Sequence, residues 1–344
     1  MEMRRLPARP FAGLAAAGLL AALAGCGAEA GGSSAEPAAG VGGDRAIRAQ
    51  KVMRLTQAHE LTGMTLLEGP TFDGNGGLLV VDVTAPSGEP KVLRVDVRKK
   101  TSRPVHTDDR GTYTSAQFSP YDGRLYLTDF SHGDIVSLAP DGGDPRTFFS
   151  GEVDGARMNP DDLAFDQEGN LYISDSRGMS RGEATGRVVR IDREGENATV
   201  LADGLASPNG ISFDAGYRGL WFSELTRNRI SYLRLDDKGG RASLHTAVQV
   251  DGGIAQTDSI AVDADGNLYQ ALHGRPAMAV YSDSGERLAT VELPARAAEG
   301  LESATNVAIT PGGTTAYMTV SGPAGGYVYR FDALAEGIRQ SNGG

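Results

Sequence analysis

Six copies of one short pattern follow each other along the chain at nearly equal intervals. Each copy has an apolar residue, a short Gly-rich turn and an apolar strand that begins with Leu or Ala. A period in the forties, built from short strands, is typical of propeller blades. The pattern predicts an all-β, six-bladed β-propeller with four-stranded antiparallel blades. The copies begin at Phe72, Phe118, Phe165, Phe213, Val262 and Ile309, so the intervals are 46, 47, 48, 49 and 47 residues.

The sixth copy is one strand short. After residues 307–309 it offers only two more apolar segments, 316–320 and 327–331, before the chain turns polar. We expect residues 51–55 to supply the missing outer strand, which closes the ring and removes an exposed strand edge. The tail from residue 333 to residue 344 is expected to be mobile.

The beginning of the chain resembles an export signal. Arg4, Arg5 and Arg9 precede an apolar stretch, residues 11–25. Fifteen residues are too few to span a bilayer of about 30 Å as a helix, so the stretch indicates a signal peptide, residues 1–25, that is not part of the fold.

The signal ends in Leu-Ala-Gly-Cys, and Cys26 is the only cysteine in the chain. This ending resembles the lipobox of bacterial lipoproteins, in which the cysteine carries the lipid. An ordinary secretory signal with an incidental cysteine is the alternative. We expect a flexible tether at 26–44, a single propeller domain at 45–344, and a protein held outside the cytoplasmic membrane by a lipid on Cys26.

The charge balance restricts the partners. The chain has 33 Lys and Arg against 44 Asp and Glu, a net charge of −11. A chain this acidic is not expected to have the basic surface that binds nucleic acid or anionic lipid. We therefore expect a monomer whose partner is a small molecule and whose membrane contact runs only through the lipid.

Polar residues recur at one symmetric position. The residue four before each copy lies at the start of the innermost strand of a blade, which lines the central channel. These six residues are Glu68, Thr114, Asp161, Asn209, Asp258 and Thr305, and the next positions hold Gly69, Ser115, Asp162, Gly210, Ser259 and Asn306. Carboxylates crowded around one axis either take up protons or hold a cation.

An all-oxygen donor set without His or Cys favours a hard cation, with Ca²⁺ ahead of Mg²⁺ and Mn²⁺. Two alternatives stay open. The polar residues can simply cap strands and bind channel water, or they can hold a structural calcium without any chemistry.

The loops that follow the second strand of each blade are expected to surround this axial site. They include a long Gly-rich loop, 176–186, and two histidines, His132 and His273. His273 is a candidate proton shuttle near neutral pH. A histidine in a propeller loop is more often a surface or packing residue.

Four motifs together resemble the senescence-marker-protein/gluconolactonase/luciferin-regenerating-enzyme family, and within it the bacterial drug-responsive lactonases. The motifs are Leu67-Glu68-Gly69-Pro70, Pro160-Asp161-Asp162-Leu163, Ser207-Pro208-Asn209-Gly210-Ile211 and Thr257-Asp258-Ser259. The resemblance covers roughly residues 55–335. It implies a six-bladed propeller, a divalent ion on the axis, usually Ca²⁺, and hydrolysis of lactones.

By position, the resemblance implies Glu68, Asn209 and Asp258 as metal ligands, and we add Asp161 to this set. Ser259 matches a hydroxyl beside the ligand aspartate. Sugar-lactone enzymes place an arginine two residues before the acidic pair, where this chain has Asn159. A gluconolactone-like substrate is therefore in doubt.

The hypothesis is a lactonase in which the metal polarises the lactone carbonyl and an axial carboxylate activates water. The carboxylate is Asp258 or one of the pair Asp161 and Asp162. The expected substrate pocket holds Thr114, Ser259, Thr305, His273 and His132. The main alternative is a non-catalytic propeller lipoprotein that binds a ligand or protein, and another is the same fold with phosphotriesterase or strictosidine-synthase-like chemistry.

Overall fold

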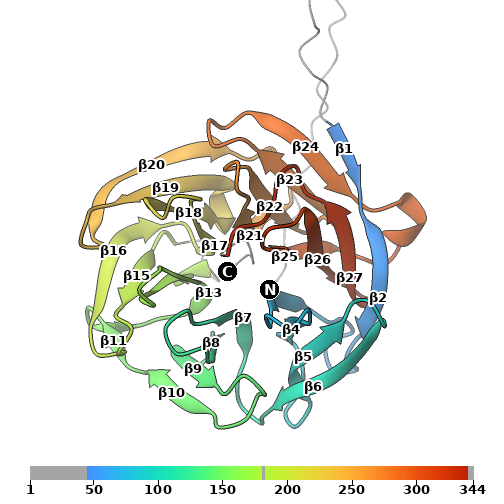
Figure 1. Cartoon of the computed structure of the whole chain (residues 1–344), viewed down its shortest axis with the longest axis horizontal. Helices are drawn as coiled ribbons and strands as arrows, with labels where there is room; N and C mark the ends of the chain where they lie inside the picture. Colours follow the sequence, from blue (N-terminus) through green and yellow to red (C-terminus); the bar gives the residue numbers. More distant parts are fainter. Residues whose placement is uncertain (1–44, 180–182, 340–344) are drawn as a thin grey trace, which may run out of the picture. The chain divides into compact units, whose positions relative to one another are not determined.

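The computed structural model describes residues 45–179 and 183–339. Six sheets are arranged around a central axis, with the first strand of each near the centre and the last strand at the rim (Figure 1). The predicted six-bladed β-propeller is thus confirmed. The predicted signal peptide, Cys26 and nearly all of the tether lie outside the described residues. Within those residues, no helix is long and apolar enough to cross a membrane.

The first four blades are four-stranded antiparallel sheets whose strands follow each other outwards in chain order. Blade one contains β3 (Leu67–Phe72), β4 (Leu78–Asp82), β5 (Pro90–Asp96) and β6 (Thr101–Thr107). Blade two contains β7 (Tyr113–Phe118), β8 (Leu125–Asp129), β9 (Asp134–Leu138) and β10 (Arg146–Phe149). Blade three contains β13 (Pro160–Phe165), β14 (Leu171–Asp175), β15 (Gly186–Ile191) and β16 (Ala198–Leu205). Blade four contains β17 (Pro208–Phe213), β18 (Gly219–Glu224), β19 (Arg229–Leu235) and β20 (Arg241–Gln249).

The last two blades both receive a strand from the N-terminal segment. Blade five contains β21 (Gln256–Val262), β22 (Leu268–His273), β23 (Ala277–Tyr281) and β24 (Arg287–Glu292), and blade six contains β25 (Ser303–Ile309), β26 (Thr315–Gly322) and β27 (Gly325–Asp332). Strand β2 (Gln50–Thr56) pairs antiparallel with β27, which confirms the predicted closure. Strand β1 (Arg45–Arg48) pairs in parallel with β24, so blade five has a fifth strand that the repeat does not predict.

The remaining elements are short. A two-stranded hairpin, β11 (Glu152–Val153) and β12 (Ala156–Arg157), lies between blades two and three in the sequence. Two 3-10 helices, η2 (Leu225–Arg227) and η3 (Ala295–Ala297), lie in loops.

The core lies between the blades, and the repeated phenylalanines form part of it. Phe165 of blade three meets Tyr126 of blade two edge-on, with ring centroids 5.2 Å apart. Phe213 of blade four meets Tyr172 of blade three in the same way at 5.0 Å. Such edge-to-face pairs add to the stabilisation from burial alone. These aromatic contacts between neighbouring blades explain why an apolar residue recurs at the same place in each copy of the repeat.

The expected mobile tail is wrong for residues 333–339, which are hydrogen-bonded to blades five and six. The Glu336 carbonyl accepts the Ala264 N–H at 2.8 Å, and the Gly337 carbonyl accepts the Gly312 N–H at 2.8 Å. Ala264 and Gly312 lie in turns that follow the first strands of their blades. The tail thus binds at the end of the ring where the first strands finish.

Candidate active site

The first strand of every blade has a bulge where the polar repeat residues lie. In blade three, β13 begins at Pro160, one residue before Asp161, and its register with β14 shifts between Pro160 and Leu163. The other five first strands shift at the corresponding place. A bulge redirects the side chains beside it. The polar residues are thus part of the strand and are turned toward the axis by the bulge.

Two glycines in the second axial layer allow neighbouring blades to approach closely. A Cβ at Gly69 would lie 2.7 Å from the backbone nitrogen of Ala116, and one at Gly210 would lie 2.4 Å from that of Ile260. Real Cβ atoms do not approach backbone so closely, so only glycine fits. These contacts fix the spacing of the first strands that carry the site.

A cavity of about 230 Å³ opens where the first strands begin. This volume is slightly below the roughly 300–1,000 Å³ of sites for drug-sized ligands, so the cavity suits a small substrate. Six predicted site residues line it: Glu68, Thr114, Asp161, Asn209, Asp258 and His273. The other lining residues are Leu66, Val83, Met179, Leu225, Thr226 and Gln256.

The acidic residues of the cavity influence each other. Burial raises the pKa of Asp161 to about 7, and the nearby Asp258 adds to this rise. Burial raises the pKa of Glu68 well above its usual value, and Asp258, Asp162 and Asp161 raise it further. Like charges in a buried site disfavour joint ionisation. The site therefore holds protons unless a cation neutralises it.

Hydrogen bonds orient Asp161. Its Oδ2 atom accepts a hydrogen bond from Nδ2 of Asn209 at 3.0 Å and one from the Ser176 hydroxyl at 3.1 Å. The same hydroxyl contacts the carbonyl of Pro208. Asp161 of blade three is thereby tied to blade four.

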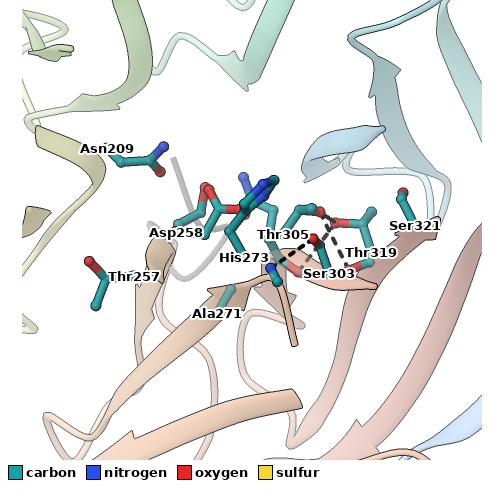
Figure 2. A network of polar contacts seen from close by, with 12 residues as sticks. Asn209, Thr257, Asp258, Ala271, His273, Ser303, Thr305, Thr319 and Ser321 are labelled. Carbon is teal, nitrogen blue, oxygen red and sulfur yellow. Dashed lines mark hydrogen bonds and ion pairs between the residues drawn. The ribbon is translucent and has the colours of Figure 1, made fainter. Parts of the chain in front are cut away.

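His273 faces Asp258, with Nδ1 3.5 Å from Oδ2 (Figure 2). A hydrogen bond to Asp258 and the charge of that residue raise the pKa of His273, although burial opposes the rise. Burial raises the pKa of Asp258, and His273 opposes this change. The two residues form a pair that can share a proton at the cavity wall.

The two axial threonines mainly hold the ring together. The Thr114 hydroxyl donates to the carbonyl of Asp161 at 2.9 Å. The Thr305 hydroxyl contacts the Leu67 carbonyl and lies 2.8 Å from Oγ1 of Thr319 (Figure 2). Both link neighbouring blades, and Thr305 is not part of the cavity lining.

The structure places three other predicted site residues outside the lining. Asp162 and Ser259 are buried beside it, and no hydrogen bond of ordinary length reaches either carboxylate oxygen of Asp162 from the described residues. Burial and the charge of Asp161 raise the pKa of Asp162, although nearby Ser259 opposes the rise. His132 lies at the end of β8, where Nδ1 is 3.0 Å from Oδ2 of Asp129.

The donor atoms at the axis suit a hard cation. Glu68 Oε2 and Asn209 Oδ1 are buried and have no hydrogen-bond partner among the described residues. Carboxylate and amide oxygens are the ligands that Ca²⁺ prefers. Within residues 45–179 and 183–339, no three His, Cys, Asp or Glu side chains group closely enough to hold a metal. A cation here would thus need the amide oxygen of Asn209 besides the carboxylates.

The sequence reasoning missed the apolar wall of the cavity, Leu66, Val83, Met179 and Leu225. Apolar residues in loops are common, so their pattern carries no signal without the fold. Ser176 was also missed, because its link to Asp161 depends on the end of one strand meeting the start of another. Arg157, the arginine nearest to position 159, is exposed, and its Nη1 atom lies 3.5 Å from Oδ1 of Asp134.

Residues 66–332 match the family model described as the SMP-30/Gluconolactonase/LRE-like region. The chain belongs to this family. A lactonase drp35 from Staphylococcus saprophyticus is 27% identical over 280 residues, covering 79% of this chain and 84% of the relative. A lactonase drp35 from Staphylococcus aureus is 27% identical over 241 residues, covering 67% of this chain and 70% of the relative.

Solved structures of other proteins have the same fold. A luciferin-regenerating enzyme superposes with a TM-score of 0.69 at 17% identity, covering 86% of this chain and 99% of that one. A calcium-binding regucalcin from Agrobacterium tumefaciens gives 0.68 at 15% identity, with coverages of 86% and 98%. A gluconolactonase from Xanthomonas campestris gives 0.66 at 20% identity, with coverages of 83% and 89%.

Proposed function

We propose that the protein is a divalent-cation-dependent lactone hydrolase. One observation carries the proposal: Glu68, Asn209, Asp161 and Asp258 line the same cavity, and Glu68 and Asn209 each have a buried oxygen without a hydrogen-bond partner in the described part of the chain. The family and its relatives named lactonases support the same reaction class.

Glu68, Asn209 and Asp258, with Asp161 beside them, would hold the cation, and Ca²⁺ there would polarise the carbonyl of a bound lactone. Asp161 then accepts a proton from the attacking water and returns it to the ring oxygen as the ester bond breaks. Burial and the nearby Asp258 raise the pKa of Asp161 in the cation-free site, and a bound cation would lower it and favour the ionised form that accepts the proton. Asn209 and Ser176 keep its carboxylate oriented during this exchange.

Asp258, paired with His273, is the alternative proton acceptor. Asp162 is less suited to direct contact with the substrate, because it is fully buried and not part of the lining. Its charge acts on the site by raising the pKa of Glu68.

The lining favours a lactone with an apolar substituent. Leu66, Val83, Met179 and Leu225 present apolar side chains, and none of the described lining residues is Arg or Lys. The carboxylates of the lining are assigned to the cation and to proton transfer, which leaves fewer polar groups for the hydroxyls of a sugar lactone. We therefore place sugar lactones below alkyl or aryl lactones as substrates.

The test is hydrolysis of a panel of sugar, alkyl and aryl lactones by the full chain, with Ca²⁺ and after EDTA. We expect turnover that EDTA removes and Ca²⁺ restores. Stabilisation by Ca²⁺ without turnover of any lactone would instead support a ligand-binding propeller with a structural cation. Aryl esters and phosphotriesters in the panel separate lactonase from other hydrolase chemistry.

We also propose that the protein is a lipoprotein outside the cytoplasmic membrane. The support is the basic start, the apolar stretch of 15 residues and the ending at Cys26.

A further inference from the structure

We propose that the ion pair between Arg187 and Asp175 positions Asp161, the residue to which the proposed function assigns proton transfer. The inference rests on that proposed function. Neither Arg187 nor Asp175 lines the cavity, so any effect on the reaction must pass through other residues.

The Arg187 guanidinium is buried and joins three segments of the chain. Its Nε atom lies 2.7 Å from Oδ2 of Asp175, at the end of β14. It also donates to the carbonyl of Ala156 at 3.1 Å and contacts that of Val153, so it anchors the β11–β12 hairpin against blade three. A bidentate or branched arrangement of this kind needs the planar guanidinium and cannot be reproduced by Lys.

Asp175 connects the ion pair to the strand that carries Asp161. Its Oδ1 atom accepts the N–H of Asn159, two residues before Asp161, at 2.7 Å. The next residue after Asp175 is Ser176, whose N–H donates to the carbonyl of Asn159 at 2.9 Å. The ion pair thus fixes both the backbone leading into Asp161 and the residue whose hydroxyl binds its carboxylate.

Blade four has a similar ion pair, between Arg229 and Glu224, close to Asn209. Glu224, at the end of β18, accepts two hydrogen bonds from Arg229, at 2.6 and 2.7 Å, and one from the Ala206 N–H at 2.8 Å. Ala206 lies three residues before Asn209. Asp161 and Asn209 hydrogen-bond to each other, so two similar ion pairs orient two residues in direct contact.

Without the guanidinium, Asp175 keeps a buried charge that has lost its partner, and the segment around Asn159 and Ser176 must rearrange. A displacement of about 1 Å at a reacting group lowers the rate by about 10²-fold. We therefore expect Arg187→Met to lower kcat for the preferred lactone by about 10²-fold with a much smaller change in KM. Arg187→Lys keeps the charge but not the branching, and is expected to lie between wild type and Arg187→Met.

A double-mutant cycle with Asp161→Asn separates positioning from general loss of structure. If Arg187 acts through Asp161, Arg187→Met has little effect in the Asp161→Asn background, within about twofold. Equal losses of kcat in both backgrounds, or an unchanged kcat in Arg187→Met, overturn the proposal. Arg94→Met, which breaks the partly buried ion pair between Arg94 and Asp73 away from the cavity, is the matched control and should leave kcat unchanged.

Ca²⁺ affinity, measured by titration, provides a second readout that needs no turnover. Arg187→Met is expected to weaken Ca²⁺ binding in the wild-type background but not in the Asp161→Asn background. Should the wild type hydrolyse no lactone, the proposed function fails while this readout still decides the positioning of Asp161. Should Arg187→Met not fold, Ser176→Ala removes the hydroxyl that binds the Asp161 carboxylate and contacts the Pro208 carbonyl, and an unchanged kcat and Ca²⁺ affinity in that variant would contradict the proposal.

Discussion

Nδ1 of His273 lies 3.5 Å from Oδ2 of Asp258, so the last residue of β22 faces an axial carboxylate of its own blade. In each residue, the interaction with the other opposes the pKa shift that burial causes. The proximity of Asp258 raises the pKa of His273, and His273 opposes the rise in the pKa of Asp258.

This pair predicts a pH-dependent contribution to stability. Because the pKa of His273 is raised above its usual 6.5, the protonated form favours the folded state. In EDTA, we expect His273→Gln to lower the melting temperature most at pH 5.5 and progressively less as pH rises through the raised pKa. A difference from wild type that grows toward pH 8 would contradict this assignment.

The clustered acids predict a change in the same direction for the metal-free protein. The pKa values of Glu68, Asp161 and Asp162 are raised in the folded state, so the folded protein binds more protons than the unfolded chain. Stability should therefore fall as pH rises from 5 to 8. Calorimetry in EDTA should show this decline, and Ca²⁺ should reduce it. Asp161→Asn should make the metal-free profile flatter.

Glu68→Gln should weaken cation binding. The change keeps the shape of the side chain but removes a charge from the donor set, so we expect at least a tenfold loss of Ca²⁺ affinity, or about 1.4 kcal/mol. Isothermal titration with Ca²⁺ measures it. Glu286→Gln, in an exposed turn, is the matched control and should bind Ca²⁺ as the wild type does.

Gly210→Ala should separate blades four and five at the axis. The new Cβ would lie 2.4 Å from the Ile260 nitrogen, in a place where backbone must move. We expect a loss of about 1–3 kcal/mol in unfolding free energy together with weaker Ca²⁺ binding, because Asn209 and Asp258 flank this contact. Chemical denaturation measures the first effect. Gly313→Ala, whose nearest neighbour is 3.7 Å away, should be close to neutral, and equal losses in both variants would refute the explanation.

Cys26→Ser should release the protein from membranes. Lipidation requires the thiol, so the variant should move from the membrane fraction to a soluble extracytoplasmic fraction while its lactone hydrolysis is unchanged. Membrane association of the variant equal to that of the wild type would exclude Cys26 as the anchor.

The repeat predicted the ring because the repeated residues make the contacts between blades, as Phe165 does with Tyr126. It also placed Glu68, Asp161, Asn209 and Asp258 together, since symmetric positions in a propeller converge on the axis. Asp162, Ser259 and Thr305 lie outside the cavity lining although their strands have the same bulge as the others, so the repeat alone does not separate the axial residues that line the cavity from those that do not.

Contacts between elements distant in sequence could be predicted only where the repeat required them, as in the closure of blade six by residues 51–55. The parallel pairing of β1 with β24 has no repeat signal, because β1 lies before the first copy. Ser176 reaches Asp161 only because the end of β14 is held beside the start of β13. The sequence likewise did not separate His273, which reaches the cavity, from His132, which pairs with Asp129 instead.

The attachment of residues 333–339 to the turns of blades five and six has a practical consequence. Glu336 and Gly337 bind where the first strands finish, whereas the cavity opens where they begin. A label attached at the exposed Arg339 therefore starts on the side away from the cavity mouth. This side of the ring is the better one for immobilising the protein when substrate must enter freely.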